Sequence, residues 1–591
     1  MADLSETAAF PFVCEGGLVL NQSTFIMKPG QALELENFEP DIDGGYKRIN
    51  GFTKYVSAVV PHTSNANENV LMVASFADKV VVARGTSIYQ ATPGGSSWTS
   101  IDSGRTSAGK YKFERFNFDG TLKLIVVDGT NAPTIFNSSL SATDVLTPNA
   151  STGESTALVA PIPDDTSMTG SGTITVSSTT GFIDPSSGTK SVLIGTEIFT
   201  YTGLTATTFT GVTRAASGTT AVAHTEGAIV ADLFPATVTG AKHVAAFKNH
   251  MFYSGMSATP QEIIFSVPFE ETNFSVGVGA GSIRVDDTVV GLKVFRDNLF
   301  IFCENRIFKL GGSSQADFAI VPVTRSIGCV NGDTIQEFAG DLIFLGPDGL
   351  RTIAGTARIG DVELGTISQN VQSVFDSNIA NSSQFDSIVI PDKTQYRIFF
   401  TKDQVAENGT IGIICVMKGQ TFEFSKIKGI RPTCTDSFID SGNVLALHGS
   451  NTGYIYRQEQ GSDFDGIAIN GKYRSPDLTM NDPGIRKHMQ KVVVNYEPES
   501  AIDADLFLRY DYESATSSRP AAYPLDSLDV VAIYGSAIYG VPTYGGPSQP
   551  LVRQAVEGSG FSVALRINDG GITAPYSIKG FQLEYQLGAR R

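Results

Sequence analysis

A short pattern recurs along this chain and limits its possible folds more than any other feature. Each copy has a turn, a run of alternating apolar residues, a second turn and a further apolar run, as antiparallel strands joined by tight hairpins would need. The clear copies are Phe76–Gln90, Phe118–Phe136, Phe247–Phe265, Phe295–Lys309, Phe338–Ile353 and Ile439–Tyr456, with a divergent copy at Ile390–Met417. Apart from one insertion, successive copies start roughly 40 to 60 residues apart, as four-stranded propeller blades do.

Each such unit leaves a sheet edge that a neighbour must cover, and a ring of units covers these edges. We therefore predict a mainly β fold. It would be a β-propeller-like ring of about six to seven antiparallel blades, with an inserted small all-β module and a C-terminal β-rich segment. A string of unrelated antiparallel domains is the alternative, because the spacing is irregular and no single-letter pattern repeats strictly.

We expect little helix, and two segments are the best candidates. Gly30–Phe38 follows Pro29, which suits the first turn of a helix. In Ser368–Asn378, Ser368 can cap the N-terminus, and an apolar stripe lies on one side of the helix. The residues of this stripe are Val371, Val374 and Phe375.

The pattern divides the chain into five segments. These are 1–60, contributing to platform and propeller closure; 61–163, the first blades; 164–232, the inserted module; 233–464, the further blades; and 465–591, a C-terminal β-rich platform segment. The insertion is rich in Ser, Thr and Gly like a linker, yet Thr173–Val176 and Glu197–Thr202 alternate as strands do. We therefore interpret it as a folded module.

Composition narrows the classes of function. Charged residues make up 17% of the chain, with 37 Phe and 19 Tyr, which disfavours a coiled coil and wholesale disorder. A formal charge of -17 gives no general attraction to phosphate or anionic lipid, so a sequence-reading DNA-binding protein is not expected. We find no secretion signal and no membrane-length apolar run, and expect a cytosolic protein unless it leaves inside a larger particle.

The sequence contains no motif of nucleotide binding, nucleophilic catalysis or zinc binding. We therefore predict no catalytic residue, no cofactor and no metal site. Four of the five cysteines lie in apolar strand-like runs and are interpreted as reduced core residues; the five are Cys14, Cys303, Cys329, Cys415 and Cys434. The histidines are expected at the surface or in turns; they are His62, His224, His243, His250, His448 and His488.

Paired carboxylates are the remaining candidates, because a glycosidase needs only two acidic side chains. The pairs are Asp41 with Asp43, Glu270 with Glu271, Asp286 with Asp287, and Asp463 with Asp465. Adjacent residues of a strand face opposite ways, so the second and third pairs cannot share a site if extended. The other two begin like calcium loops but lack the third oxygen ligand and the terminal Glu, so we interpret them as turns.

The order of several phrases resembles one family, the tail nozzle proteins of tailed bacteriophages, also called tail tubular or stabilisation proteins. The phrases are Gly16–Asn21, Pro29–Pro40, Gly44–Phe52, Tyr253–Gly255, Ile264–Pro268, Asp287–Asp297, Ile301–Cys303, Ile327–Cys329, Asp341–Leu350, Gly355–Val362, Ile533–Gly546 and Ile578–Tyr585. The likeness covers most of the chain. The insertion instead resembles a small β module of phage structural proteins, through Gly195–Gly203, Phe209–Ala215 and Ala223–Gly227.

The resemblance implies a homohexameric ring of propeller subunits below a head-to-tail adaptor ring. It would retain double-stranded genomic DNA and then conduct it during ejection, without sequence-specific binding, with tail fibres or a tail plug as further partners. The protein would be in the virion tail and be assembled in the host cytoplasm. Six copies would carry on the order of a hundred negative charges, which suits a channel in which DNA meets few attachment points.

The resemblance extends to a Tyr-Gly repeat in the C-terminal segment. We expect its rigid rings, Tyr534, Tyr539 and Tyr544, to contact a neighbouring subunit or the adaptor. A surface loop covering its own domain is the alternative.

Two competing functions stay open. One is a propeller-type glycan-binding or glycan-cleaving tail protein, and the other a general cytosolic scaffold.

Overall fold

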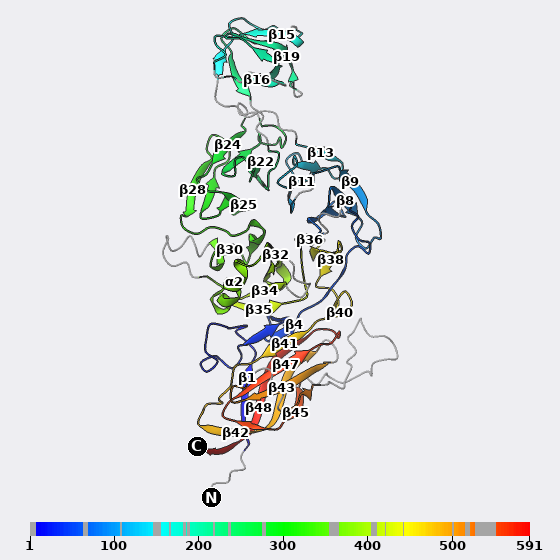
Figure 1. The fold of residues 1–591 in the computed structure, drawn as a ribbon, viewed down its shortest axis with the longest axis vertical. Coiled ribbons are helices and arrows are strands. Elements are labelled where there is room, and N and C mark those ends of the chain that lie inside the picture. Colours follow the sequence, from blue (N-terminus) through cyan, green and yellow to red (C-terminus); the bar gives the residue numbers. More distant parts are fainter. Residues whose placement is uncertain are drawn as a thin grey trace. The chain divides into compact units, whose positions relative to one another are not determined.

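The computed structural model describes residues 7–62, 69–106, 109–145, 155–164, 167–180, 182, 185, 189–216, 219–233, 238–274, 279–353, 366–402, 410–419, 421–440, 442–498, 502–513, 520–525 and 551–590. Strands dominate these residues, as predicted (Figure 1). They form two compact units. The first unit is Met1–Ser100 with Val330–Arg591, and the second unit is Ile101–Cys329.

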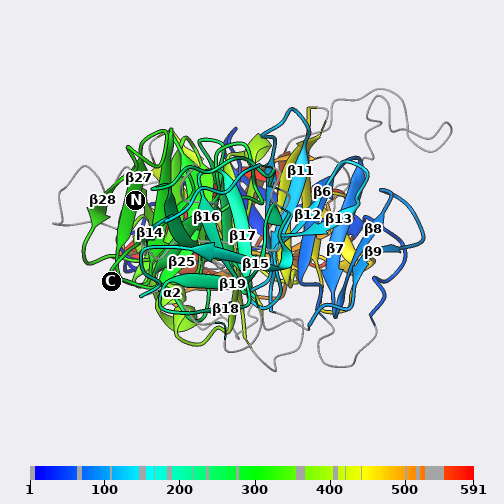
Figure 2. The same cartoon turned by 90° about the horizontal axis from the view of Figure 1, so that it is seen from above.

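Six small, mainly antiparallel sheets of the described residues form a six-blade β-propeller arrangement, within the predicted range. Figure 2 shows one of them, β6 to β9. The first unit holds three of them. The first consists of β6 (Met72–Phe76), β7 (Lys79–Arg84), β8 (Ser87–Ala91) and β9 (Thr99–Ser103), the last of which continues past the end of the unit at Ser100; the second consists of β29 (Gln336–Phe338), β30 (Asp341–Gly346) and β31 (Gly349–Thr352). The third consists of β36 (Cys434–Asp440), β37 (Asn443–Gly449), β38 (Ile455–Gln458) and β5 (Phe52–Lys54), with β39 (Asp463–Phe464) and β40 (Ile467–Ala468). The second unit holds β10 (Lys112–Phe116), β11 (Lys123–Val127), β12 (Thr134–Phe136) and β13 (Ala142–Asp144); β21 (His243–Phe247), β22 (His250–Ser254), β23 (Glu262–Phe265) and β24 (Gly281–Arg284); and β25 (Val289–Phe295), β26 (Asn298–Cys303), β27 (Ile307–Gly311) and β28 (Ala319–Thr324).

The recurring sequence pattern corresponds to a two-residue hairpin between the first two strands of a blade. In four blades both central residues of this turn have positive φ: Ala77 (51°) and Asp78 (57°), Lys248 (48°) and Asn249 (63°), Arg296 (45°) and Asp297 (60°), and Ala339 (54°) and Gly340 (75°). Such a turn matches the right-handed twist of the strands that it joins. The Phe before each turn is buried, so the pattern combines a turn with a core anchor.

In the second unit, the blades pack through their first strands, because β10 contacts β21 and β21 contacts β25. One apolar cluster joins the first two blades and includes Phe116 and Tyr253. Another joins the second and third blades and includes Phe252 and Ile301. Burial between sheet faces therefore holds these three blades together.

The insertion forms one sheet with its own apolar core. The strands are β14 (Ser155–Ala157), β15 (Thr169–Thr175), β16 (Lys190–Ile194), β17 (Glu197–Tyr201), β18 (Gly203–Leu204), β19 (Thr208–Thr213) and β20 (Ile229–Leu233). The expected segment 164–232 starts too late, because β14 pairs with β20 and closes the module. All three residues of β14 are exposed or half-buried, so the strand lacks the apolar alternation by which it could have been recognised in the sequence.

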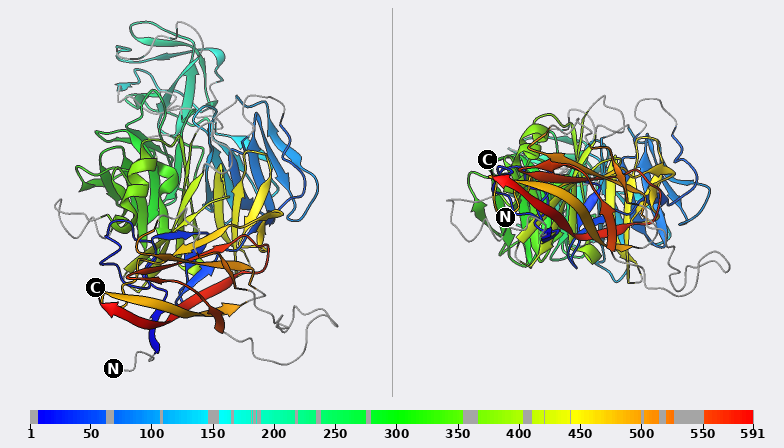
Figure 3. Two further views of the ribbon diagram at one scale, coloured as in Figure 1. Left: turned by 60° about the horizontal axis from the view of Figure 1, so that its bottom comes forward. Right: turned by 90° about the horizontal axis from the view of Figure 1, so that it is seen from below.

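Two larger sheets complete the first unit. The nine-stranded sheet has the order β32 (Gln384–Ile390), β33 (Gln395–Thr401), β34 (Ile411–Lys418), β35 (Thr421–Ile427), β2 (Glu34–Glu36), β41 (Gly471–Arg474), β47 (Val563–Asp569), β43 (Ala504–Tyr510) and β44 (Tyr523–Pro524). The seven-stranded sheet contains β1 (Thr7–Val13), β3 (Phe38–Pro40), β4 (Tyr46–Arg48), β42 (Ile485–Pro498), β45 (Leu551–Ala555), β46 (Ser559–Gly560) and β48 (Tyr576–Arg590). Figure 3 shows its two long strands, β42 in orange and β48 in red, side by side. The divergent repeat copy forms β32 to β34 at one end of the nine-stranded sheet, and β32 packs against β29 and β36 of two blades.

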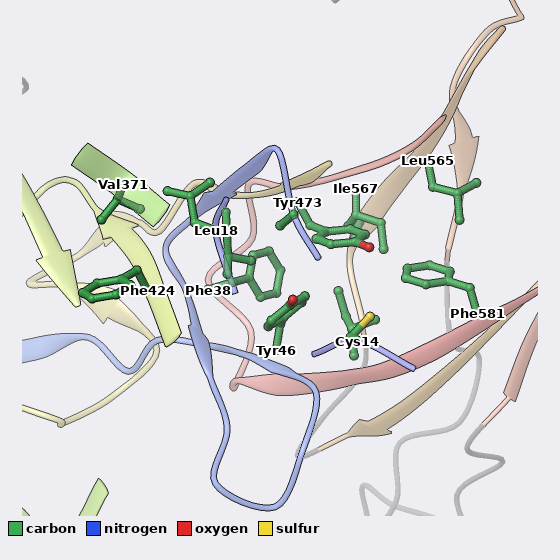
Figure 4. Packing of buried hydrophobic residues seen from close by; sticks show 14 of the residues in the cluster. Cys14, Leu18, Phe38, Tyr46, Val371, Phe424, Tyr473, Leu565, Ile567 and Phe581 are labelled. Carbon is green, nitrogen blue, oxygen red and sulfur yellow. The ribbon is translucent and has the colours of Figure 1, made fainter. Parts of the chain in front are cut away.

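The main apolar cluster of the first unit joins these two sheets (Figure 4). Tyr473 of the nine-stranded sheet stacks on Phe581 of the seven-stranded sheet, with ring centroids 5.6 Å apart and an angle of 8° between the planes. The buried hydroxyl of Tyr46 donates a hydrogen bond to the Gly30 carbonyl (2.6 Å) and accepts one from the Gly17 amide (3.1 Å). Because its hydroxyl is satisfied, this aromatic side chain can be buried at little cost.

The N-terminal segment contributes to three sheets of the first unit. β1, β3 and β4 enter the seven-stranded sheet, and β2 enters the nine-stranded sheet. β5 pairs with β38, so a strand from the start of the chain completes a blade built about 400 residues later.

One of the two predicted helices is wrong. Gly30–Phe38 contains β2 and the start of β3 in place of a helix, because Asn37 at φ 56° turns the chain between them and Leu35 and Phe38 enter the core. The other is confirmed as α2 (Gln372–Ile379), after the short 3₁₀ turn η4 (Gln369–Val371). Further 3₁₀ turns are η3 (Gly332–Thr334) and η5 (Pro391–Lys393).

The stripe of α2 is buried as predicted, whereas the capping role of Ser368 is wrong. Its hydroxyl accepts a hydrogen bond from the Leu350 amide (3.1 Å) and caps no helical amide.

Candidate functional site

The predicted interface residues Tyr534, Tyr539 and Tyr544 lie outside the described residues, as does Gly355–Val362. Among the described residues, no helix is long and apolar enough to cross a membrane. In the same residues, no three His, Cys, Asp or Glu side chains gather closely enough to hold a metal ion.

The structure places the candidate carboxylates in turns and ion pairs. Asp41 accepts a hydrogen bond from the Asp43 amide through its side chain, and Asp463 accepts one from the Gly466 amide (2.7 Å). Their interpretation as turn residues is therefore confirmed. Asp465 forms an ion pair with Lys54 (3.0 Å).

The two adjacent pairs are each divided between different partners. Asp286 forms an ion pair with Arg306, whereas Asp287 accepts hydrogen bonds from the Thr288 and Asn305 amides.

Glu271 binds Lys123 (2.6 Å), whereas Glu270 accepts a hydrogen bond from Asn273 (2.7 Å). In neither pair do the two carboxylates share one partner, so the expectation of separate environments holds.

All five cysteines are buried thiols, which confirms the interpretation of the strand cysteines as core residues. Burial raises the pKa of Cys303 to about 12 and that of Cys415 further. Thiols with such pKa values carry almost no thiolate at neutral pH and are poor nucleophiles.

The prediction for the histidines is wrong for half of them. His224, His250 and His448 are buried. Burial lowers the pKa of His448 to about 3 and also lowers that of His250, so both rings are neutral at neutral pH. His448 packs against aromatic rings. Burying a neutral imidazole there costs far less desolvation free energy than burying a charged one would.

The motif residues of the inserted module meet in a buried cluster around Glu197. Arg214 donates two hydrogen bonds to the carboxylate through Nε and Nη2 (both 2.8 Å), and His224 Nε2 lies 2.9 Å from it. Burial alone would raise the pKa of Glu197, but the hydrogen bonds from Arg214 and the Val222 amide lower it to about 2. The cluster is enclosed and organises the core of the inserted module.

A second buried cluster joins three sheets of the first unit. Arg397 of β33 binds Glu459 (2.5 Å) and Glu39 of β3 (3.3 Å), and it donates a hydrogen bond to Gln458 of β38 (3.1 Å). Lys393 contacts both carboxylates at 2.5 Å. Sequence reasoning missed this cluster because its members are far apart in the chain.

The first unit contains a pocket of about 620 Å³, lined by residues of the β36–β38 blade and of the nine-stranded sheet. One wall is a row of four directly paired residues: Glu36 of β2, Lys472 of β41, Asn568 of β47 and Asp505 of β43. Because partners in register share one face of a sheet, these side chains form a continuous polar row.

The other wall is aromatic. Phe52 and Phe464 stack with centroids 5.0 Å apart and an angle of 13° between the planes, and Tyr456 stacks on His448 at 5.2 Å. Sequence reasoning found none of these pocket residues, except Asp465 as a turn residue and His448 as a surface candidate. Their proximity depends on β5 joining the blade.

No family model matches the chain, and no curated protein matches it. Solved structures that are similar include PorZ, a surface component of the type-IX secretion system of Porphyromonas gingivalis (10% identity, 72% of this chain, 45% of PorZ, TM-score 0.23). Hsv2 of Kluyveromyces lactis (10%, 61% of this chain, 96% of Hsv2, TM-score 0.24) and the AfRom2 CNH domain (9%, 69% and 99%, TM-score 0.29) are others. The chain spans less than half of PorZ. At such values none of them indicates a function for this chain.

Proposed function

We propose that this protein is a structural subunit of a bacteriophage tail nozzle, without catalytic turnover. Six copies would form a ring below the head-to-tail adaptor that retains double-stranded DNA and then conducts it during ejection. The observation that carries the proposal is the order of family-like phrases from Gly16 to Tyr585, which extends over most of the chain. The propeller arrangement that this resemblance implied is compatible with it.

Two physical features suit this role. The formal charge of -17 per chain disfavours phosphate contacts that would have to break during ejection. The Arg397 cluster crosslinks three sheets, and removing one partner of such a buried pair costs about 3–5 kcal/mol. A subunit with such crosslinks resists deformation under the load of moving DNA.

The test is the particle formed by the purified chain, alone and mixed with its adaptor. We expect a six-fold ring with a central hole in electron micrographs and the corresponding mass by light scattering. Replacing Tyr534, Tyr539 and Tyr544 together by Ser should reduce assembly and leave the circular dichroism of the chain unchanged. A monomer under both conditions, or particles without a hole, would refute the nozzle.

The glycan-cleaving competitor is tested with the same material. Incubation with host surface polysaccharide should release no reducing ends if the protein is a nozzle subunit. Release of reducing ends would favour the competitor.

A further inference from the structure

We infer that the 620 Å³ pocket of the first unit binds a neutral, hydroxyl-rich ligand with the chemistry of a sugar ring. This inference is independent of the nozzle proposal, because it depends only on the walls of the pocket. The volume falls within the range of about 300–1,000 Å³ of small-molecule sites.

Three of the four carboxylates that line the pocket are compensated locally. Glu36 is bridged by Lys428 (2.7 Å) and Lys472 (3.6 Å). Asp465 is paired with Lys54 (3.0 Å), and Asp569 with Arg48 (3.4 Å). An ion entering the pocket would have to compete with these pairs, whereas a neutral ligand would leave them intact.

The polar wall still has capacity for hydrogen bonds. The side-chain oxygen of Asn568 is buried and has no donor among the described residues. Its neighbour in register, Asp505, is an exposed residue that lines the same pocket. The Asn568 oxygen is fully buried and therefore closed to the pocket, so Asp505 is the acceptor of this row that a ligand hydroxyl can reach.

The opposite wall suits the remaining surface of a sugar ring. A sugar presents C–H groups on its faces and hydroxyls at its rim, so it can pack on an aromatic wall and hydrogen-bond to a polar one. Tyr456 is only half buried and contributes to this wall, with Phe52 and Phe464 behind it. The polar row and the aromatic wall together therefore favour a sugar over an ion or a purely apolar ligand.

The geometry of the pocket is fixed before any ligand binds. Asn37, at φ 56°, donates a hydrogen bond from Nδ2 to the Asn470 carbonyl (2.9 Å) and accepts one from the Lys428 amide (2.8 Å). One side chain thus holds two pocket segments, and such pre-organisation reduces the entropy lost on binding.

The test is saturation-transfer NMR on the intact chain with glucose, galactose, mannose and N-acetylglucosamine, and with oligosaccharides of each. We expect transfer to at least one sugar. Stronger binding of the oligosaccharide would indicate the end of a polysaccharide as the source, and equal binding a free monosaccharide. Transfer to none of these probes, or displacement by inorganic phosphate in preference to sugars, would overturn the inference.

Variants assign the signal to the pocket. Asp505→Ala should weaken binding by about tenfold, the effect of about one hydrogen bond. Asn470→Trp should abolish binding by filling the cavity, since Asn470 is an exposed lining residue that accepts the hydrogen bond from Asn37 through its backbone carbonyl. The matched control is Asp503→Ala, an exposed acidic residue two positions away that does not line the pocket. Binding unchanged in Asn470→Trp, in a chain with wild-type circular dichroism, would refute the site.

Discussion

At the scale of single residues, the hairpin turns contain strained backbone conformations, and these conformations allow the two strands to pair correctly. Ala77 and Asp78 both occupy the left-handed region, where a Cβ costs about 1–2 kcal/mol per residue. Lys248 and Arg296 do the same in other blades. The strain is tolerated because this turn matches the twist of the two strands that it joins.

Ala77→Gly should therefore stabilise the first unit. Removing the Cβ relieves about 1–2 kcal/mol of strain, and the greater freedom of Gly in the unfolded chain returns about 0.5–1 kcal/mol of it. The expected net gain is about 0.5–1 kcal/mol in the free energy of unfolding, measured with denaturant. The control Ala83→Gly, inside the buried strand β7, should destabilise instead. Equal effects of the two variants would contradict this account of the turn.

Residue patterns revealed the turns but not the burial of charged and polar groups. Phe76 and its counterparts were predictable because a local pattern specifies both the anchor and the turn. Burial of His448 was not, since it depends on Phe52, from a strand about 400 residues away.

At the scale of elements, the inserted module shows how a small sheet obtains a defined core. Its apolar cluster is supplemented by the Glu197–Arg214 ion pair. The Glu197 carboxylate also accepts hydrogen bonds from the backbone amides of Ala215 and Val222. Alternating strands were visible in the sequence, whereas this pairing was not. The reason is that Glu197 begins β17 whereas Arg214 directly follows β19, so the two side chains meet only when the sheet folds.

Glu197→Gln should destabilise the module by about 3 kcal/mol, because it leaves the Arg214 charge buried without a counter-charge. Its low pKa also predicts the pH dependence. A carboxylate with a folded pKa of about 2 and an unfolded value of 4.5 contributes its full stabilisation above about pH 4.5, and this is lost as the pH falls towards 2.

Hydrogen exchange of β16, β17 and β19 would measure the effect. The difference between wild type and Glu197→Gln should shrink from pH 5 towards pH 2. Glu226→Gln, at an exposed residue of the same module, is the matched control and should change little. A constant difference across this pH range would contradict the role assigned to the carboxylate.

At the scale of the whole molecule, the chain has two compact units with separate apolar clusters. The first unit is discontinuous in sequence, because the second unit is inserted between Ser100 and Val330. Each unit therefore buries its own core, and cooperative unfolding is expected within a unit more strongly than across the chain.

Calorimetry of the full chain should accordingly show more than one unfolding transition. Ala77→Gly should raise the transition of the first unit, and Glu197→Gln should lower a different one, since Glu197 belongs to the second unit. A single transition whose calorimetric and van't Hoff enthalpies agree would contradict separate units.

The sequence by itself determined what depends on neighbours in the chain: the strand periodicity, the hairpin turns, the blade-like repeat and the apolar stripe of α2. Tertiary structure alone decided what depends on distant partners: that Gly30–Phe38 is extended, that β14 begins the module at Ser155, and that the Arg397 cluster and the pocket exist. The physical reason is the range of the interactions. Turn strain and side-chain alternation act over a few residues, whereas burial and ion pairing are defined only once β2, β5 and β47 have reached their sheets.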